Sequence, residues 1–271
     1  MQDRLRHVRE RWDHVRGRDF RSLQAGWWHD DVPDVVLVPG LGALSYFVDT
    51  LAVCGDRARA HLLDVPGFGH RAARVCPAGV GAVAEAVSGW IDEVLGRPVV
   101  LVGHSTGAQA ALHVAAARPD LVRSLLLLGP TFPPEQRALM ELLLAFVRNF
   151  VHEPPALVPA TAPDYLRGGP REIARFIRSA QLDEPEQVIT QVRCPVLVAR
   201  GEHDAFAPLP WVERLAGAAR DGRVEVVGGA HTFPFRRGAL TARLVASCVL
   251  GFEGPKPPAL PKEPGPAPSA G

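Results

Sequence analysis

The sequence of 271 residues has almost no net charge and few cysteines. Its 30 lysine and arginine residues are balanced by 29 aspartate and glutamate residues, so no overall field attracts nucleic acid. The four cysteines are Cys54, Cys76, Cys194 and Cys248. They are scattered and form no Cys-x-x-Cys pair, which argues against a zinc knuckle and against a disulfide framework. We therefore expect reduced thiols, no bound metal and no cofactor.

Long apolar runs are also missing. No segment approaches the roughly 18 consecutive apolar residues that a membrane span needs. The first twenty residues are too rich in charge to contain the apolar centre of a signal peptide. These absences predict a soluble, cytoplasmic protein without a membrane span, and they leave its oligomeric state open.

Residues 1–20 form a charged N-terminal segment in which four apolar residues recur at helical spacing. These residues are Leu5, Val8, Trp12 and Val15. The pattern predicts a short amphipathic helix or arm that docks on its own domain. A role in binding a partner or a membrane surface is the alternative, and the acidic residues within the segment disfavour it.

The body of the chain alternates short apolar runs with helical stretches. Runs of this length, rich in Val and Leu, are typical of strands buried on both faces, as in a parallel sheet. They cover residues 35–40, 61–67, 98–104, 124–130, 195–201 and 223–229. Helical stretches such as 83–95 and 108–119 separate most of them. The alternation predicts an α/β fold with a doubly wound, mostly parallel sheet, made of residues 21–130 and 192–252.

One long segment, residues 131–191, interrupts this alternation without a strand-like run. Residues 137–150 are helical and apolar on nearly every face, and residues 164–181 contribute one or two more helices. An insertion of this size at one end of a sheet commonly forms a lid over a site. The alternative is a helical subdomain that only completes the core. Four residues are candidates for lining a substrate pocket or for packing in that core: Leu139, Met140, Leu143 and Phe146.

The C-terminal segment, residues 253–271, is rich in proline. Such a composition cannot form a packed element, so it predicts a disordered, semi-extended tail.

Gly-His-Ser-Thr-Gly, residues 103–107, stands between a predicted buried strand and a helix of small residues. This is the strand–turn–helix context of a nucleophile elbow, in which the glycines permit a tight turn and the serine oxygen projects at the edge of the sheet. The turn also places Ser105 at a helix N-terminus, where backbone N–H groups face negative charge. Ser105 is therefore the candidate nucleophile.

A serine nucleophile needs a base, and the base needs an acid that orients it. Among ten histidines, His231 follows the last predicted strand and precedes the final helix. Asp204 follows the preceding strand, and Glu202 in the same loop is the rival acid. Ser105, Asp204 and His231 occur in the order expected of a hydrolase triad, each beyond the carboxyl end of a strand.

The oxyanion of a tetrahedral intermediate requires backbone N–H donors. One is expected from Thr106, the residue after the nucleophile. The loop 38–45 follows the first of the predicted buried strands, and its Leu41 is the candidate for the second donor.

Taken together, these motifs resemble the α/β-hydrolase superfamily over residues 20–252. The elbow, the Asp-Val-Pro-Gly-Phe-Gly turn at 64–69, the acid loop 201–208 and the base loop 228–235 fall in the family's order. The resemblance implies the α/β-hydrolase fold with a helical lid inserted after the sixth strand, and the serine-nucleophile branch, since a carboxylate does not stand at the elbow. One departure is Pro39-Gly40, where the family usually has His-Gly before the oxyanion loop.

The resemblance implies a serine hydrolase that cleaves a small to medium apolar ester, lactone or related acyl compound through an acyl-enzyme. A lid without clustered charge favours an apolar substrate. Carbon–carbon bond hydrolysis and acyl transfer on the same triad are alternatives within the enzyme class. A non-catalytic member that only binds a ligand is the alternative from another class.

Overall fold

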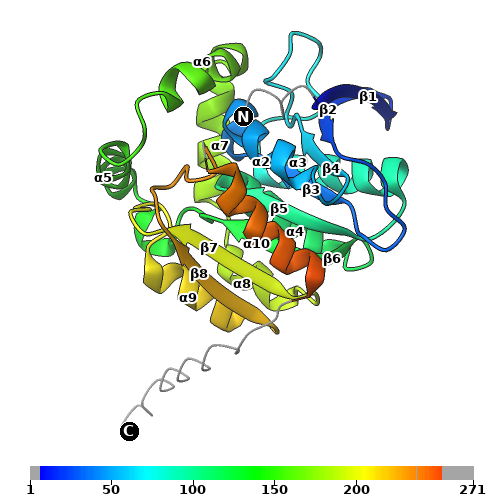
Figure 1. The fold of residues 1–271 in the computed structure, drawn as a ribbon. Helices are drawn as coiled ribbons and strands as arrows, with labels where there is room; N and C mark the ends of the chain where they lie inside the picture. Colours follow the sequence, from blue (N-terminus) through cyan, green and yellow to red (C-terminus); the bar gives the residue numbers. More distant parts are fainter. Residues whose placement is uncertain (1–6, 236, 252–271) are drawn as a thin grey trace, which may run out of the picture.

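The computed structural model describes residues 7–235 and 237–251, and within them eight strands form one sheet (Figure 1). The strand order is β1-β2-β4-β3-β5-β6-β7-β8. The strands are β1 Arg9–Val15, β2 Arg18–Ala25, β3 Val35–Val38, β4 Ala60–Leu63, β5 Val99–His104, β6 Val122–Leu128, β7 Val196–Gly201 and β8 Gly222–Val227. The first two strands pair antiparallel with their neighbours, and the other pairs are parallel. The predicted mostly parallel sheet is confirmed.

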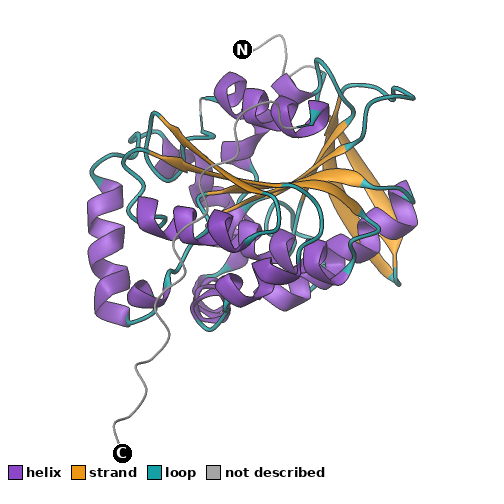
Figure 2. Ribbon diagram, turned by 90° about the horizontal axis from the view of Figure 1, so that it is seen from below, coloured by secondary structure: helices purple, strands orange, loops and turns teal. Residues whose placement is uncertain are grey.

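Helices cover both faces of this sheet, as Figure 2 shows with the sheet seen nearly edge-on. The helices of the sheet layers are α2 Val48–Cys54, α3 Val80–Trp90, α4 Thr106–Ala117, α9 Leu209–Ala218 and α10 Gly238–Leu250. Three shorter turns accompany them: η1 Gly40–Gly42, η2 Ser45–Phe47 and the π-helical η3 Ile91–Leu95. The helices predicted over 83–95 and 108–119 are therefore present.

The apolar runs are continuous because successive side chains of a strand point to opposite faces of the sheet and both faces are buried. In β3, Val36 and Val38 belong to the core that α3, α4 and α9 cover, whereas Val35 and Leu37 belong to the core under α2 and α10. Since both faces of the sheet are packed against helices, neither set of side chains meets water, and each position favours an apolar residue.

The segment between β6 and β7 is a helical insertion. It contains η4 Pro134–Gln136, α5 Leu139–Phe150, α6 Leu157–Gly168, α7 Pro170–Gln181, α8 Pro185–Val188 and η5 Ile189–Gln191. Its parts differ in burial: Phe176 and Ala180 of α7 lie in the core of the sheet layers, whereas much of α5 is exposed. Figure 1 draws α5 at the margin of the molecule. One part of the insertion thus completes the core, and another part projects from it.

The helix predicted in the N-terminal segment is wrong for the residues that the structure describes. Residues 9–15 and 18–25 are β1 and β2, an antiparallel hairpin at the edge of the sheet. Arg16 and Gly17 connect them with φ values of 49° and 76°, the geometry of a two-residue type I′ turn. Strand pairing therefore overrides the helical spacing of the apolar residues, and the short Arg-Gly turn was the sequence signal for it.

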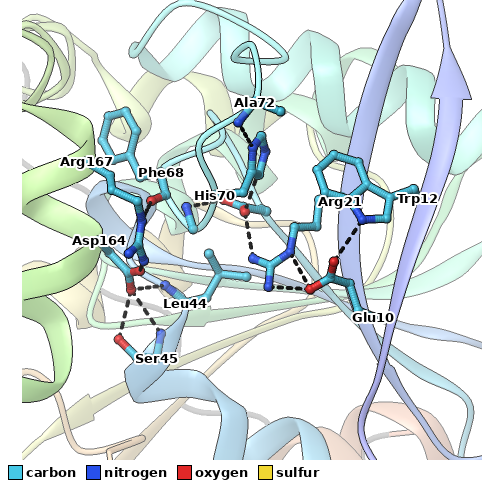
Figure 3. A network of polar contacts seen from close by, with 12 residues as sticks. Glu10, Trp12, Arg21, Leu44, Ser45, Phe68, His70, Ala72, Asp164 and Arg167 are labelled. Carbon is cyan, nitrogen blue, oxygen red and sulfur yellow. Dashed lines mark hydrogen bonds and ion pairs between the residues drawn. The ribbon is translucent and has the colours of Figure 1, made fainter.

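Arg21 attaches this hairpin to the rest of the sheet (Figure 3). Its guanidinium lies 2.8 Å from a Glu10 carboxylate oxygen on β1 and 3.0 Å from one of Asp64, which follows β4. The hairpin is thus part of the sheet, so the core extends to the N-terminal side of residue 21. The predicted proline-rich tail, residues 253–271, lies outside the described residues. In the described ranges, no helix has the length and apolar character required to span a bilayer.

Candidate active site

Ser105 stands in a strained turn directly after β5. Its φ of 57° and ψ of −125° form a conformation that residues other than glycine rarely adopt. Its N–H donates to the Leu128 carbonyl oxygen at 2.9 Å, and its own carbonyl oxygen accepts from the N–H of Ala108 at 2.9 Å. Hydrogen bonds on both sides therefore hold the strained residue at the N-terminus of α4.

The glycines on either side of Ser105 let the elements of the turn approach closely. A Cβ atom on Gly107 would lie 2.5 Å from the carbonyl oxygens of Val38 and Pro39, and one on Gly103 would overlap the carbonyl of Gly107. Since such contacts are too short for real Cβ atoms, the geometry of this turn explains the small residues that flank the serine.

Asp204 and His231 come from the loops after β7 and β8 and are hydrogen bonded to each other. Nδ1 of His231 lies 2.9 Å from Oδ2 of Asp204. The other oxygen of Asp204 accepts from the backbone N–H groups of Phe206 and Ala207 at 2.9 and 3.0 Å. This arrangement leaves Nε2 of a neutral His231 available as a proton acceptor. The rival acid Glu202 is half exposed and faces His203 instead.

The pKa values of this pair shift in opposite directions. Burial alone would raise the pKa of Asp204, but the charge and hydrogen bond of His231 and the Ala207 N–H hold it below its ordinary value. Burial alone would lower the pKa of His231, but Asp204 and, more weakly, Glu153 raise it above its ordinary value. The pair is thus arranged to stabilise a protonated imidazole beside an ionised carboxylate.

The structure brings the loops of these three residues together at the carboxyl edge of the sheet. Gly129 follows Leu128, the residue whose carbonyl accepts from Ser105. A Cβ on Gly129 would lie 2.8 Å from Oδ2 of Asp204 and 3.0 Å from Nδ1 of His231. A Cβ on Gly40 would likewise lie 2.7 Å from the Cβ of Ser105. The loops that contain Ser105, Asp204 and His231 therefore lie close together.

Leu41 lies in the turn η1, beside the start of α4. Its φ of 46° is positive, and its N–H donates to the Thr106 hydroxyl oxygen at 2.9 Å. Leu41 and Thr106, the two residues predicted as oxyanion donors, are thus in direct contact, and the Leu41 N–H points toward the residue after Ser105.

A buried hydrogen-bonded chain connects this loop to the loop of His231. The N–H of Gly40 donates to the Tyr46 hydroxyl oxygen at 2.6 Å, and that oxygen lies 2.8 Å from Nδ1 of His104. Nε2 of His104 lies 2.9 Å from the carbonyl oxygen of His231. All three bonds form together when Tyr46 donates to Nδ1 and Nε2–H donates to the carbonyl. Burial, together with the charge of His231, lowers the pKa of His104 to about 3, which keeps its imidazole neutral.

The contacts of Tyr46 and His104 have no signal in the sequence. His104 is adjacent to Ser105 in the chain, whereas its contact with His231 bridges residues far apart in sequence. Only the folded structure places the two together.

Asp164 of α6 holds the other end of the same loop (Figure 3). Its Oδ2 accepts from the N–H groups of Leu44 and Ser45 and from the Ser45 hydroxyl, at 2.8–3.3 Å. Its Oδ1 accepts from Arg167, which also donates to the Phe68 carbonyl oxygen. The helical insertion is therefore bonded directly to the loop that contains Leu41.

Three of the four candidates for lining a pocket are exposed rather than packed in the core. The exposed fractions of Met140, Leu143 and Phe146 are 65%, 51% and 58%. The side chain of Leu139 lies outside the described structure. Phe146 has a connection to the site, because its ring lies 6.4 Å from that of Phe206, which stands edge-on to His231 at 5.0 Å between centroids.

Two cavities of about 260 and 240 Å³ lie along the N-terminal hairpin. The first is lined by residues such as Phe20 and Cys76, and the second by residues such as Arg9 and Trp27. Neither contains Ser105, Asp204 or His231 in its lining, so these cavities are separate from the candidate site.

Known proteins resemble this chain in sequence and in fold. A pimeloyl-[acyl-carrier protein] methyl ester esterase of Neisseria meningitidis is 28% identical over 235 residues, covering 76% of this chain and 88% of that protein. Lipase LipV of Mycobacterium tuberculosis is 33% identical over 135 residues, covering 47% of this chain and 50% of that protein. The crystal structure of a serine hydrolase involved in carbazole degradation superposes with a TM-score of 0.73 at 19% identity, covering 90% of this chain and 99% of that one.

The profile of the Alpha/beta hydrolase family matches residues 35–244, from β3 to α10. This range contains the elbow, the acid loop and the base loop, as well as the helical insertion. The chain therefore belongs to the alpha/beta hydrolase family.

Proposed function

We propose that this α/β-fold hydrolase is a serine esterase that cleaves a small to medium apolar ester, lactone or related acyl compound. The observation that carries the proposal is the strained elbow of Ser105 beside the hydrogen-bonded pair of Asp204 and His231. A serine hydroxyl, a buried imidazole and a carboxylate at one sheet edge are the groups that acyl transfer requires.

In the first half of the reaction, Ser105 Oγ attacks the carbonyl carbon of the substrate, and Nε2 of His231 takes the hydroxyl proton. The ester C–O bond breaks as His231 returns this proton to the leaving alcohol, which leaves an acyl group on Ser105. A water molecule then attacks the acyl carbon and gives one proton to His231. The imidazole passes this proton to Ser105 Oγ as the bond between the acyl carbon and Oγ breaks, and the carboxylic acid leaves. Asp204 orients the imidazole and stabilises its protonated form.

The backbone N–H groups of Leu41 and Thr106 stabilise the oxyanion in each tetrahedral intermediate. In the free protein, the Leu41 N–H is bonded to the Thr106 hydroxyl. The oxyanion has to replace this hydroxyl as the acceptor. A charged acceptor forms the stronger hydrogen bond, so the exchange favours the transition state over the free enzyme.

The preference for an apolar acyl group is supported by the aromatic side chains near the base. Phe206 stands against His231, and Phe146 of α5 stands against Phe206. The similar proteins named above include a methyl ester esterase and a lipase.

The test is to treat the purified protein and its Ser105→Ala variant with a fluorophosphonate, and to locate the adduct by peptide mass. We expect labelling at Ser105 in the native protein and none in the variant or in heat-unfolded protein. Esters, lactones and thioesters graded by acyl length would then give the substrate range.

A folded protein that resists the probe and hydrolyses no ester in the panel would overturn the proposal in favour of a ligand-binding protein. Cleavage of a vinylogous diketone in preference to every ester would identify a carbon–carbon bond hydrolase instead. Transfer of the acyl group to an added alcohol, at the expense of hydrolysis, would identify an acyltransferase.

A further inference from the structure

Helix α5 turns a polar edge toward the loops of the acid and the base. Asn149, in its last turn, is buried in a helix that is otherwise largely apolar and exposed. Its Oδ1 accepts from the N–H of Ala205, the residue after Asp204, at 3.3 Å. Its Nδ2 donates to Oε1 of Glu153, just beyond the end of the helix, at 3.1 Å.

Glu153 extends this contact to the base loop. Its Oε1 also accepts from the N–H of Thr232, the residue after His231, at 2.7 Å. Two side chains of the insertion therefore hold the backbone on the C-terminal side of both Asp204 and His231. The bonded chain runs from Ala205 through Asn149 and Glu153 to Thr232. It adds a further connection between two loops that are also joined by the hydrogen bond from the His203 N–H to the Gly229 carbonyl oxygen.

The second carboxylate oxygen of Glu153 is buried and has no hydrogen-bond partner among the described residues. A carboxylate in this position is costly unless a positive charge lies nearby. The imidazole of His231 supplies such a charge when it is protonated, and Glu153 contributes to the raised pKa of that group. The other titratable groups around His231 are Asp204 and His104, and Tyr165 of α6 lies near Glu153.

We propose that Asn149 and Glu153 are positioning residues of the hydrolase. Their side chains hold the acid loop and the base loop in fixed positions relative to each other, and the Glu153 carboxylate stabilises protonated His231. This inference rests on the proposed function for its kinetic readout. In this role, α5 belongs to the framework that positions the catalytic residues. A helix that only covered the site would need no hydrogen bonds to either loop.

The experiment compares Glu153→Ala and Glu153→Gln in the full-length protein. Glutamine retains an oxygen that accepts from Thr232 and Asn149 but removes the charge, whereas alanine removes both. With a short-chain p-nitrophenyl ester, we expect Glu153→Ala to lower kcat about 10- to 100-fold with little change in KM, because the acid and base loops are no longer held in position. Glu153→Gln should recover most of kcat, while the acid limb of its kcat/KM profile moves to lower pH.

The matched control is Glu141→Gln, which removes a carboxylate from the exposed first turn of the same helix. The imidazoles of His152 and His203, stacked with 4.6 Å between centroids, are present in both glutamine variants. We expect the control to match the native enzyme in kcat and in pH profile. Asn149→Ala combined with Glu153→Ala should cost less than the sum of the single variants, because the two residues form one chain.

Native activity in a folded Glu153→Ala protein would overturn the inference, as would a Glu153→Gln profile identical to that of Glu141→Gln. If Glu153→Ala does not fold, the Glu153→Gln comparison still decides the question. If the native protein neither labels nor turns over, the proposed function has failed by itself. The pKa of His231, read by NMR titration in the native protein and the two glutamine variants, then tests the contact without turnover, and an unchanged pKa would overturn it.

Discussion

The imidazole of His104 lies against that of His231, with 4.8 Å between ring centroids and a hydrogen bond from its Nε2 to the His231 carbonyl oxygen. One histidine is thus held neutral by burial while its neighbour is held ready to take a proton. Through its hydrogen bonds, the His104 ring connects the oxyanion loop to the base loop. Its neutrality matters because a second positive charge at this distance would oppose protonation of His231.

Replacing Tyr46 with phenylalanine tests this connection between the two loops. The change removes the acceptor of the Gly40 N–H and the hydroxyl bonded to His104, while the ring remains. A buried N–H left without a partner costs about 1–3 kcal/mol, so we expect a lower midpoint in thermal unfolding. We also expect kcat/KM for a p-nitrophenyl ester to fall about tenfold, because the loop that contains Leu41 loses a support.

Phe47→Leu is the control for a loss of aromatic packing in the same region, since Phe47 also stands beside His104 but forms no hydrogen bond through its side chain. Equal losses of kcat/KM at equal stability in the two variants would count against a specific role for the hydroxyl.

Gly129→Ala tests how tightly the acid and base are packed. Its φ of 51° is unfavourable for alanine, and the added Cβ would meet Oδ2 of Asp204 and Nδ1 of His231 at 2.8 and 3.0 Å. We expect the hydrogen bond between the two side chains to be displaced and turnover to fall by about 100-fold or more. Stopped-flow or progress-curve kinetics on a purified, folded variant would measure it.

Gly96→Ala introduces the same backbone strain at a φ of 62° in a turn after η3, where the nearest atom to the added Cβ is 3.6 Å away. It should lose stability with little loss of kcat. Retention of native kcat in Gly129→Ala would show that the pair tolerates displacement.

The sequence could predict the sheet because its strands are buried on both faces and read as continuous apolar runs. It could predict Ser105, Asp204 and His231 as neighbours, because carboxyl ends of parallel strands meet at one edge. The hairpin escaped prediction, since an edge strand is mostly exposed and its pairing decides its conformation. Tyr46, Asn149 and Glu153 escaped as well, because their partners lie in distant segments that only folding brings near.

Asp164→Ala tests the bond between the insertion and the oxyanion loop. The change leaves the N–H groups of Leu44 and Ser45 without their acceptor and removes the ion pair with Arg167. We expect the free energy of unfolding to fall by about 1–3 kcal/mol, measured by urea denaturation, and labelling of Ser105 by the fluorophosphonate to slow. Asp183→Ala, which removes a hydrogen-bond contact of the insertion with His113 instead, should leave the labelling rate unchanged.

The pH dependence of activity follows from the opposite pKa shifts of Asp204 and His231. His231 acts as a base only when neutral, so kcat/KM should fall as the pH drops through its pKa, which lies above the ordinary value of 6.5. A group whose pKa is raised by folding stabilises the fold below its unfolded pKa, and this contribution disappears as the pH rises through the folded pKa. Asp204, with a lowered pKa, stabilises the fold above its unfolded value of 3.8, and its contribution is lost in acid.

The native protein should therefore lose this part of its stability as the pH rises from about 6 through the folded pKa of His231, whereas a His231→Gln variant should not show this loss. Thermal unfolding of both proteins across this range measures the difference. Coincident curves for the two proteins would mean that His231 titrates alike in the folded and unfolded chains. The Asp204 carboxylate would then not stabilise protonated His231 in the free enzyme, and the acid limb of kcat/KM would lie at the ordinary pKa of an imidazole, 6.5.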